Sequence, residues 1–229
     1  MKKIGLIGGI SWQSTHYYYK KINEEVSQRL GGMHSARVLL ESVDFNDIVA
    51  AQENDDWELV GETLTEAALN LEKGGAQFLA ICSNTVHAAA SKVQHSSNLP
   101  FIHIADATAD AVKNQGIVKV GLIGTEYLMK SSWYRERLHS CSIEVILPGE
   151  VEQKELQRQI FEELCFSHVR SSSKRQTVNI LNNMRKQGAE GMVLGCTEFG
   201  LMLQEKDVSY PIFDSSEIHI KKITDQALN

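Results

Sequence analysis

Two segments of the chain place reactive and hydrogen-bonding side chains directly after an apolar run. They are "AICSNTVH" at 80–87 and "VLGCTEFG" at 193–200. In each segment the apolar run is typical of a buried strand, and the small polar residues after it are typical of a helix start. Backbone N–H groups at a helix start bind anions, and the helix dipole favours a thiolate. Either segment alone is most simply a strand, a turn and a cap, so a functional interpretation needs a relation between the two.

An internal repeat supplies that relation. "KIGLIG" begins at residue 3 and "KVGLIG" at residue 119, an offset of 116 positions. Further along, Gly75 matches Gly188 at an offset of 113, and Pro100 matches Pro211 at an offset of 111. Three matches in the same order, with a slowly drifting offset, indicate a duplication. We therefore predict two similar halves, with a site in a cleft between them to which both polar segments contribute.

The repeat also predicts which side chains correspond in the two halves. At the offset of 113, Cys196 aligns with Ser83, whereas the neighbouring Cys82 aligns with Gly195. Successive side chains of a strand point to opposite faces, so a difference of one residue decides which group enters the site. We expect Ser83 and Cys196 to face the site and Cys82 to be a small buried hydrophobic residue.

Short apolar runs alternate with longer helical patterns along the chain. The predicted strands are Ile4–Gly8, Val38–Val43, Phe78–Cys82, Phe101–Ile104, Val120–Gly124, Ile143–Leu147, Met192–Gly195 and Pro211–Phe213. Helical periodicity covers Trp57–Lys73, Lys154–Cys165 and Thr177–Lys186. This alternation is typical of an α/β fold, in which helices cover both faces of a parallel sheet. The expected halves are residues 1–104, completed by a C-terminal helix at 215–229, and residues 105–214.

The composition excludes several classes of partner. The 229 residues are 42% hydrophobic and 23% charged, with a net charge of −6 and no dense basic cluster, which argues against nucleic acid. No apolar run approaches the roughly 20 residues that cross a bilayer. The N-terminal apolar run is short and broken by glycine, unlike a signal peptide. We therefore expect a cytoplasmic protein without a membrane partner.

The cysteines do not predict a metal site or disulfides. The chain has four cysteines, Cys82, Cys141, Cys165 and Cys196. None of them shows CxxC spacing, so we expect free thiols in a reducing compartment. The nucleotide-like "GLIGG" near the N-terminus does not fit the G-x-G-x-x-G spacing of a dinucleotide site.

Several motifs together resemble the aspartate/glutamate racemase superfamily over nearly the whole chain. They are "IGLIGGISWQST", "LLESVDF", "CSNTVH", "PFIHIADAT", "IFEELC" and "GCTE". The resemblance implies two pseudo-symmetric, Rossmann-like α/β halves with the active site in the cleft between them. It also implies amino-acid racemisation, of aspartate, glutamate or a broader range, without pyridoxal phosphate, metal or nucleotide. The chain is most similar to a broad-specificity branch with a hydroxyl residue in place of the first cysteine.

Racemisation explains why such a family needs two halves. The reaction removes the Cα proton on one face and returns a proton on the other, so one acid/base group is needed on each face. The resemblance assigns these roles to Ser83 and Cys196. It implies that the substrate is bound by Gln52, Asn84, Thr85, Thr125, Thr197 and Glu198. Glu198 would orient the thiol or bind the ammonium group, and an exposed helix residue is the alternative interpretation of Gln52.

The chain departs from the usual pattern of the superfamily at two positions. Typical members have Cys-Asn-Thr where this chain has Ser83-Asn84-Thr85, and a serine hydroxyl is a far weaker acid than a thiol. Cys165 falls where many aspartate racemases carry a lysine, which argues against strict aspartate specificity. His87, four residues after Ser83, would assist the serine or serve as a structural histidine.

These departures keep two alternatives open. One is a single-thiol decarboxylase or isomerase of the same superfamily, resembling arylmalonate decarboxylase. The other is a non-catalytic relative that binds a small molecule. The expected partner is a small-molecule amino acid, and the expected assembly is a monomer or a homodimer.

Overall fold

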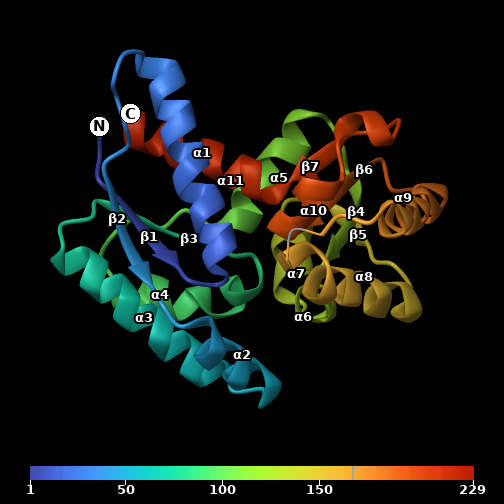
Figure 1. Cartoon of the computed structure of the whole chain (residues 1–229), viewed down its shortest axis with the longest axis horizontal. Coiled ribbons are helices and arrows are strands. Elements are labelled where there is room, and N and C mark those ends of the chain that lie inside the picture. The colour runs from blue at the N-terminus through green and yellow to red at the C-terminus, as the bar shows by residue number, and fades with distance from the viewer. Residues whose placement is uncertain (167) are drawn as a thin grey trace. The chain divides into compact units, whose positions relative to one another are not determined.

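Each half of the chain forms one parallel sheet (Figure 1). The computed structural model describes residues 1–166 and 168–229. The first sheet has the order β2-β1-β3, with β1 at Ile4–Gly8, β2 at Val38–Ser42 and β3 at Phe78–Ile81. The second has the order β5-β4-β6-β7, with β4 at Lys119–Gly124, β5 at Glu144–Ile146, β6 at Gly191–Gly195 and β7 at Ile212–Asp214. The predicted α/β fold with two short parallel sheets is confirmed.

Helices follow nearly every strand. In the first half they are α1 Trp12–Leu30, α2 Phe45–Glu53, α3 Trp57–Lys73, the 3-10 turn η1 Thr85–Ala89 and α4 Ala90–Ser96. The remaining elements are α5 Ile104–Asn114, α6 Glu126–Lys130, α7 Trp133–Ser140, α8 Glu150–Glu162, η2 Leu164–Phe166, α9 Ser171–Lys186, α10 Thr197–Met202, η3 Glu205–Asp207 and α11 Ser215–Leu228. Across the described ranges, none of the helices combines the length and apolar character that crossing a membrane requires.

The strand register reproduces the internal alignment predicted from the sequence. Ile7 on β1 pairs with Ile81 on β3, and Ile123 on β4 pairs with Leu194 on β6. Ile7 and Ile123 are separated by the repeat's first offset, 116 positions, and Ile81 and Leu194 by its second, 113 positions. The two strand pairs therefore correspond residue for residue, which supports a duplication.

The predicted strand over Phe101–Ile104 is wrong in its extent. Only Phe101 pairs with the sheet, through an isolated parallel bridge to Leu79, and α5 begins at Ile104. The chain turns into a helix there before a second bridge can form. In the second sheet β7 occupies the equivalent edge position and is a full strand. The two sheets therefore differ at this edge.

The helix that ends each repeat belongs to the other compact unit. The two units are Met1–Ile104 with His219–Asn229, and Ala105–Ile218. Helix α5 follows the first sheet in the chain but lies in the second unit from Ala105 onward. Helix α11 follows the second sheet but contributes to the first unit from His219 onward. The duplication has therefore exchanged equivalent helices between the two units.

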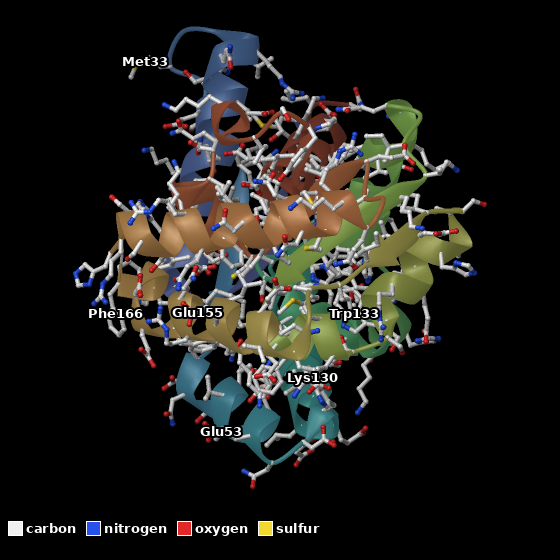
Figure 2. The ribbon with its side chains drawn as sticks, turned by 90° about the vertical axis from the view of Figure 1, so that its right-hand side faces the viewer. Met33, Glu53, Lys130, Trp133, Glu155 and Phe166 are labelled. Carbon is white, nitrogen blue, oxygen red and sulfur yellow. The ribbon has the colours of Figure 1, made fainter. Side chains whose placement is uncertain are left out.

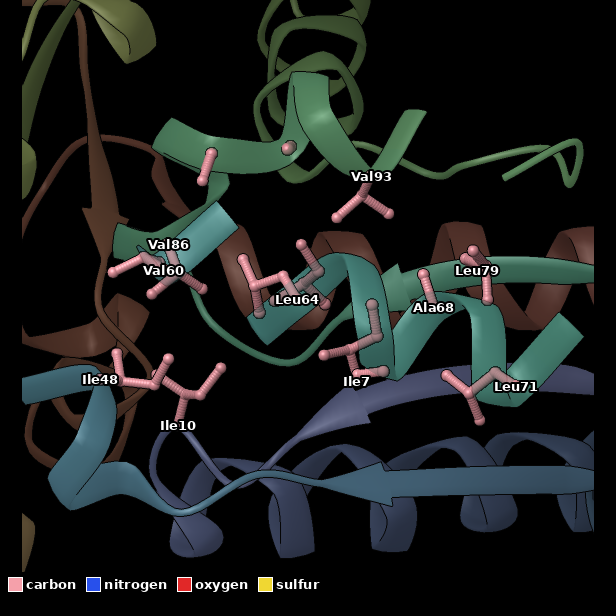
Figure 3. Packing of buried hydrophobic residues seen from close by; sticks show 14 of the residues in the cluster. Ile7, Ile10, Ile48, Val60, Leu64, Ala68, Leu71, Leu79, Val86 and Val93 are labelled. Atoms are coloured by element: carbon pink, nitrogen blue, oxygen red, sulfur yellow. The ribbon is translucent and has the colours of Figure 1, made fainter. Parts of the chain in front are cut away.

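The first unit buries apolar side chains on both faces of its sheet. Figure 3 shows one face, where Ile7 and Leu79 of the sheet pack with Leu64 and Leu71 of α3. On the other face the sheet contacts α1 and α11, and the cluster is Ile4, Leu6, Tyr18, Ile22, Phe78, Ala80, Cys82, Ile220, Ile223 and Ala227. Alternate residues of β1 and β3 thus enter opposite clusters, as the period of a strand requires.

In the second unit α8 and α9 lie side by side (Figure 2) and cover one face of the sheet. The buried hydroxyl of Thr177 on α9 donates to the side-chain oxygen of Gln159 on α8 at 2.7 Å. Helix α8 begins earlier and ends earlier than the predicted Lys154–Cys165, because the Glu152 carboxylate caps Gly149 N–H at 3.0 Å and Glu163 leaves helical geometry. Cys165 lies beyond the helix, in η2.

Each exchanged helix bonds to a buried tyrosine at an equivalent position. In the first unit Tyr18 Oη–H donates to His219 Nδ1 at 3.0 Å, and in the second Tyr134 Oη–H donates to Thr108 Oγ1 at 3.2 Å. The tyrosines are 116 positions apart and their partners 111, as in the repeat. All four side chains are buried. Both halves therefore anchor the exchanged helix by the same polar contact.

Burial of His219 predicts a loss of stability in acid. Burial lowers the pKa of His219 to about 4, so the ring stays neutral in the fold while the unfolded chain binds a proton below about pH 6.5. Stability is lost as the pH falls from about 6.5 towards 4. Between pH 8 and pH 5 this group removes about 2 kcal/mol. We expect His219→Gln to weaken this pH dependence, measured by urea unfolding at several pH values.

The exposed His16 on α1 provides the matched control. His16→Gln should leave the pH dependence as it is in the unaltered protein, because this side chain is exposed in the fold as in the unfolded chain. An equal pH dependence in His219→Gln and His16→Gln would contradict the assignment.

Candidate functional site

Cys82 directly follows β3, and its backbone N–H and carbonyl both make hydrogen bonds. Cys82 N–H donates to Ile7 O at 2.9 Å, and Cys82 O accepts from the buried Ser14 hydroxyl at 2.8 Å. The thiol lies in the cluster beneath α1 and α11, and burial raises its pKa far above the usual range. The prediction that Cys82 is a buried hydrophobic residue is confirmed.

The polar segment Ser83-Asn84-Thr85 follows directly. Ser83 and Thr85 are partly exposed, and Asn84 is buried. The next element is the 3-10 turn η1, and the Asn84 side chain makes no capping hydrogen bond to it. The expected α-helix starts only at Ala90. The segment is therefore a turn that presents polar side chains, and simple helix capping does not account for it.

Gln52 lies in the same unit as Ser83. It is the penultimate residue of α2 and is partly exposed, and its carbonyl accepts from Asp55 N–H at 3.1 Å. Within residues 1–166 no hydrogen bond joins the Gln52 side chain to Ser83. A role for Gln52 in binding stays a prediction.

In the second unit Cys196 follows β6 and stands at the N-cap of α10. The thiol, in a residue 7% exposed, donates to Glu198 Oε2 at 2.9 Å. Thr197 Oγ1 donates to the same oxygen at 2.7 Å. Glu198 is itself only 9% exposed. The three predicted residues of the "GCTE" motif therefore form one hydrogen-bonded group, in which Cys196 and Glu198 are buried and Thr197 is partly exposed.

The surroundings of Cys196 favour the thiol and not the thiolate. Burial raises the pKa of Cys196 well above its usual value, and the nearby Glu198 charge raises it further. The expectation that a helix start would favour the thiolate is therefore wrong for this structure. Helix α10 has only six residues, and a carboxylate in direct contact with the thiol outweighs its dipole.

Thr125 emerges next to Cys196 at the same edge of the second sheet. Gly124 and Gly195 are paired in register, so the residues that follow them leave adjacent strands together. The Thr125 hydroxyl accepts from Leu128 N–H at 3.1 Å and caps α6. The role of Thr125 in binding stays a prediction.

Cys165 adds a second thiol to the same neighbourhood. It is partly buried in η2 and packs against the cluster that contains Cys196. Burial raises the pKa of Cys165 to about 12, with a smaller effect of the Glu198 charge. The candidate group in the second unit thus combines two protonated thiols, hydroxyls and one buried carboxylate. Within residues 1–166 and 168–229, His, Cys, Asp and Glu side chains form no group of three that could hold a metal ion.

The register establishes the correspondence between the two segments. Because Ile81 and Leu194 are equivalent positions of β3 and β6, the residues two places further on are Ser83 and Cys196. The structure thus aligns a hydroxyl in one unit with a thiol in the other, and Cys82 with Gly195.

Ser14 and His219 were not predicted from the sequence to contact this region. The Ser14 hydroxyl on α1 donates to the Cys82 carbonyl, and His219 on α11 belongs to the first unit. Neither contact has a local signal, because each joins segments far apart in the chain. The internal repeat, which aligns Tyr18 with Tyr134, is the one sequence signal that pointed to the helix partner of Tyr18, and that partner is His219.

The family model Asp/Glu/Hydantoin racemase matches residues 7–223. The chain belongs to the Asp/Glu/hydantoin racemase family. Among curated proteins, the broad-specificity amino-acid racemase RacX of Bacillus subtilis (strain 168) is 22% identical over 224 residues, which cover 93% of this chain and 92% of RacX. Relatives in this family are named as racemases, which are isomerases.

Two solved structures match the chain over its full length. A putative Asp/Glu racemase from Yersinia pestis is 42% identical, covers 100% of both chains and has a TM-score of 0.94. An aspartate racemase homologue from Pyrococcus horikoshii OT3 is 37% identical, again over 100% of both chains, with a TM-score of 0.88. The racemase fold therefore extends over the whole chain.

The contact between Cys196 and Glu198 predicts how the thiol reacts. Glu198→Gln removes the charge that disfavours the thiolate, so the pKa of Cys196 should fall. We expect the pH at which Cys196 becomes half-maximally reactive towards iodoacetamide to fall in this variant, followed site by site with mass spectrometry.

Two other cysteines calibrate the labelling. Cys141, at the C-cap of α7, should react alike in both proteins, and Cys82 should react only after unfolding because it is fully buried. An unchanged or higher midpoint for Cys196 in Glu198→Gln would show that the carboxylate does not control the thiol.

Proposed function

We propose that the protein is a cofactor-independent amino-acid racemase that interconverts L and D enantiomers. Membership of the Asp/Glu/hydantoin racemase family supports this proposal. The observation that carries it is the register, which makes Ser83 and Cys196 equivalent positions of the two repeats. The reaction needs one acid/base group for each face of the Cα atom, and a duplicated position provides two.

In this proposal Cys196 acts together with Glu198. The thiol rests protonated, so it must lose its proton before it can remove one from Cα. Glu198 Oε2, 2.9 Å from Sγ, is the acceptor for that proton. The thiolate then removes the Cα proton and becomes a thiol again, leaving a planar carbanion that a proton can reach from the opposite face.

Ser83 is the proposed group on the opposite face. Its hydroxyl donates a proton to the carbanion and recovers one from water, while the proton held by Glu198 returns to water, so that both groups are restored. In the reverse direction the serine must receive the Cα proton, which a hydroxyl does far less readily than a thiolate. The two faces therefore have unequal chemistry, although the equilibrium between enantiomers must still be one.

The remaining predicted residues are proposed to hold the substrate. Asn84 and Thr85, with Gln52, would act from the first unit, and Thr125 and Thr197 from the second. Because Glu198 is assigned to the Cys196 proton, binding the substrate ammonium group is its alternative role, and Cys165 supplies no positive charge for a side-chain carboxylate. We therefore propose a substrate range broader than aspartate and glutamate.

Isotope exchange tests this proposal. The protein is incubated in D₂O with a panel of L-amino acids and their D enantiomers, and Cα deuteration and chirality are followed together. Cys196→Ala should lower both rates by about 10²-fold or more. Ser83→Ala should slow racemisation but spare exchange with retained configuration, and Ser83→Cys should give a working enzyme with more equal rates from the two enantiomers.

The buried thiol provides the matched control. Cys82→Ala removes a thiol one residue from Ser83 and should leave both rates near those of the unaltered protein. Normal racemisation in Cys196→Ala would rule the mechanism out, and lost activity in Cys82→Ala would assign the second acid/base to that thiol.

One observation favours a second candidate, a single-thiol decarboxylase of the same superfamily. Of the two equivalent positions, Cys196 carries a thiol and Ser83 carries a hydroxyl. Such an enzyme would release CO₂ from a substituted malonate and protonate the product from one face. CO₂ release without exchange of any amino acid would favour it, and ligand binding without either reaction would indicate a non-catalytic relative.

A further inference from the structure

Three buried histidines meet in the first unit, and we call His87, His103 and His219 the histidine cluster. The ring centroids of His87 lie 4.7 Å from those of His103 and 5.7 Å from those of His219. The three residues are between 0% and 4% exposed. They come from η1, from the segment before α5 and from α11, so the cluster is assembled by the fold and not by local sequence.

His87 connects this cluster to Ser83. Its Nδ1–H donates to the Ser83 carbonyl at 2.6 Å, and its Nε2 accepts from Ile104 N–H at 3.4 Å. These two contacts define a neutral ring protonated on Nδ1. The ring thereby ties the peptide of Ser83 to the first residue of α5.

His219 holds the same segment from the other side. Its Nε2–H donates to Ile102 O at 2.9 Å while Nδ1 accepts from Tyr18. The backbone on either side of His103 is therefore fixed by two histidine rings. The chain leaves the first unit at Ile104 and returns to it at His219, so both connections are anchored at this cluster.

The second unit has no equivalent of His87. The repeat that aligns Ser83 with Cys196 aligns His87 with Gly200, and His103 with Asp214. A Cβ atom at Gly200 would clash with Asp214 Oδ2, so the space beside Gly200 is already filled. A histidine ring that hydrogen-bonds to the backbone at this position is thus found only at the Ser83 position and not at the equivalent Cys196 position.

We propose that His87 is a positioning residue for Ser83, an inference that rests on the proposed racemase function. The Cys196 thiol is held by its own hydrogen bond to Glu198, whereas at Ser83 the contact from His87 is to the carbonyl of its peptide. Fixing the Ser83 carbonyl fixes that peptide. A misplacement of about 1 Å in a reacting group costs about 10²-fold in rate, so loss of the His87 hydrogen bond to Ser83 should slow the reaction measurably.

The test compares three variants in D₂O exchange with an amino-acid substrate. His87→Leu removes the donor to Ser83 and should slow racemisation about 10- to 100-fold while sparing one-sided exchange at the Cys196 face. His87→Asn keeps a donor near the position of Nδ1 and should restore most of the rate. The double variant Ser83→Ala/His87→Leu should be no slower than Ser83→Ala, because His87 then has nothing left to position.

His95 provides a matched control. Its Nδ1 makes the same contact with the carbonyl four residues earlier, Ser91 O at 2.6 Å, but the side chain is exposed. His95→Leu should leave both rates unchanged.

Each other outcome overturns the proposal. Equal losses on both faces in His87→Leu, with a matching loss of unfolding free energy, would indicate a purely structural histidine. Equal losses in His87→Asn and His87→Leu would indicate a titrating ring. Additive losses in the double variant would also refute positioning. Failure of the proposed function is distinct, because the unaltered protein would then show no exchange at all.

Discussion

The pairing of the first strand with the third in each half determines where the candidate residues lie. In a parallel sheet the carboxyl ends of adjacent strands meet at one edge, and this is where ligands bind in such folds. The register between β1 and β3 is the same as that between β4 and β6, so the residues that leave the two sheets are matched one for one. A shift of one residue would exchange Ser83 for Cys82 and place a buried thiol where the hydroxyl stands.

Burial then decides the chemical state of these groups. Cys196 is enclosed beside a carboxylate, and both effects hold its proton on sulfur. Its counterpart is a hydroxyl, which also rests protonated. In the proposed reaction, a resting state with two protonated groups would donate a proton to the substrate readily but would accept one only after a first proton had left. The short contact between Cys196 and Glu198 offers a route for that proton in one unit, and this makes the two halves unequal although their backbones correspond.

Much of this arrangement was predictable from the sequence, because it depends on period and offset. The alternation along β3 predicted that Cys82 is buried, and the repeat predicted the correspondence of Ser83 with Cys196. The protonation state of Cys196 was not predictable, since it depends on where the Glu198 carboxylate points and on the depth of burial. The prediction of a strand over Phe101–Ile104 was also wrong, because the same apolar residues are compatible with a single bridge followed by a helix.

The exchange of α5 and α11 makes the surroundings of Ser83 depend on the end of the chain. Ile220, Ile223 and Ala227 complete the cluster that buries Cys82, and His219 supplies one ring of the histidine cluster. A first half made of residues 1–104 alone would lack both. Its sheet would expose an apolar face, and the segment before α5 would lose the contact from His219 to Ile102. The duplicated halves are therefore equivalent in topology but not independent, since each is completed by a helix that the other half's repeat encodes.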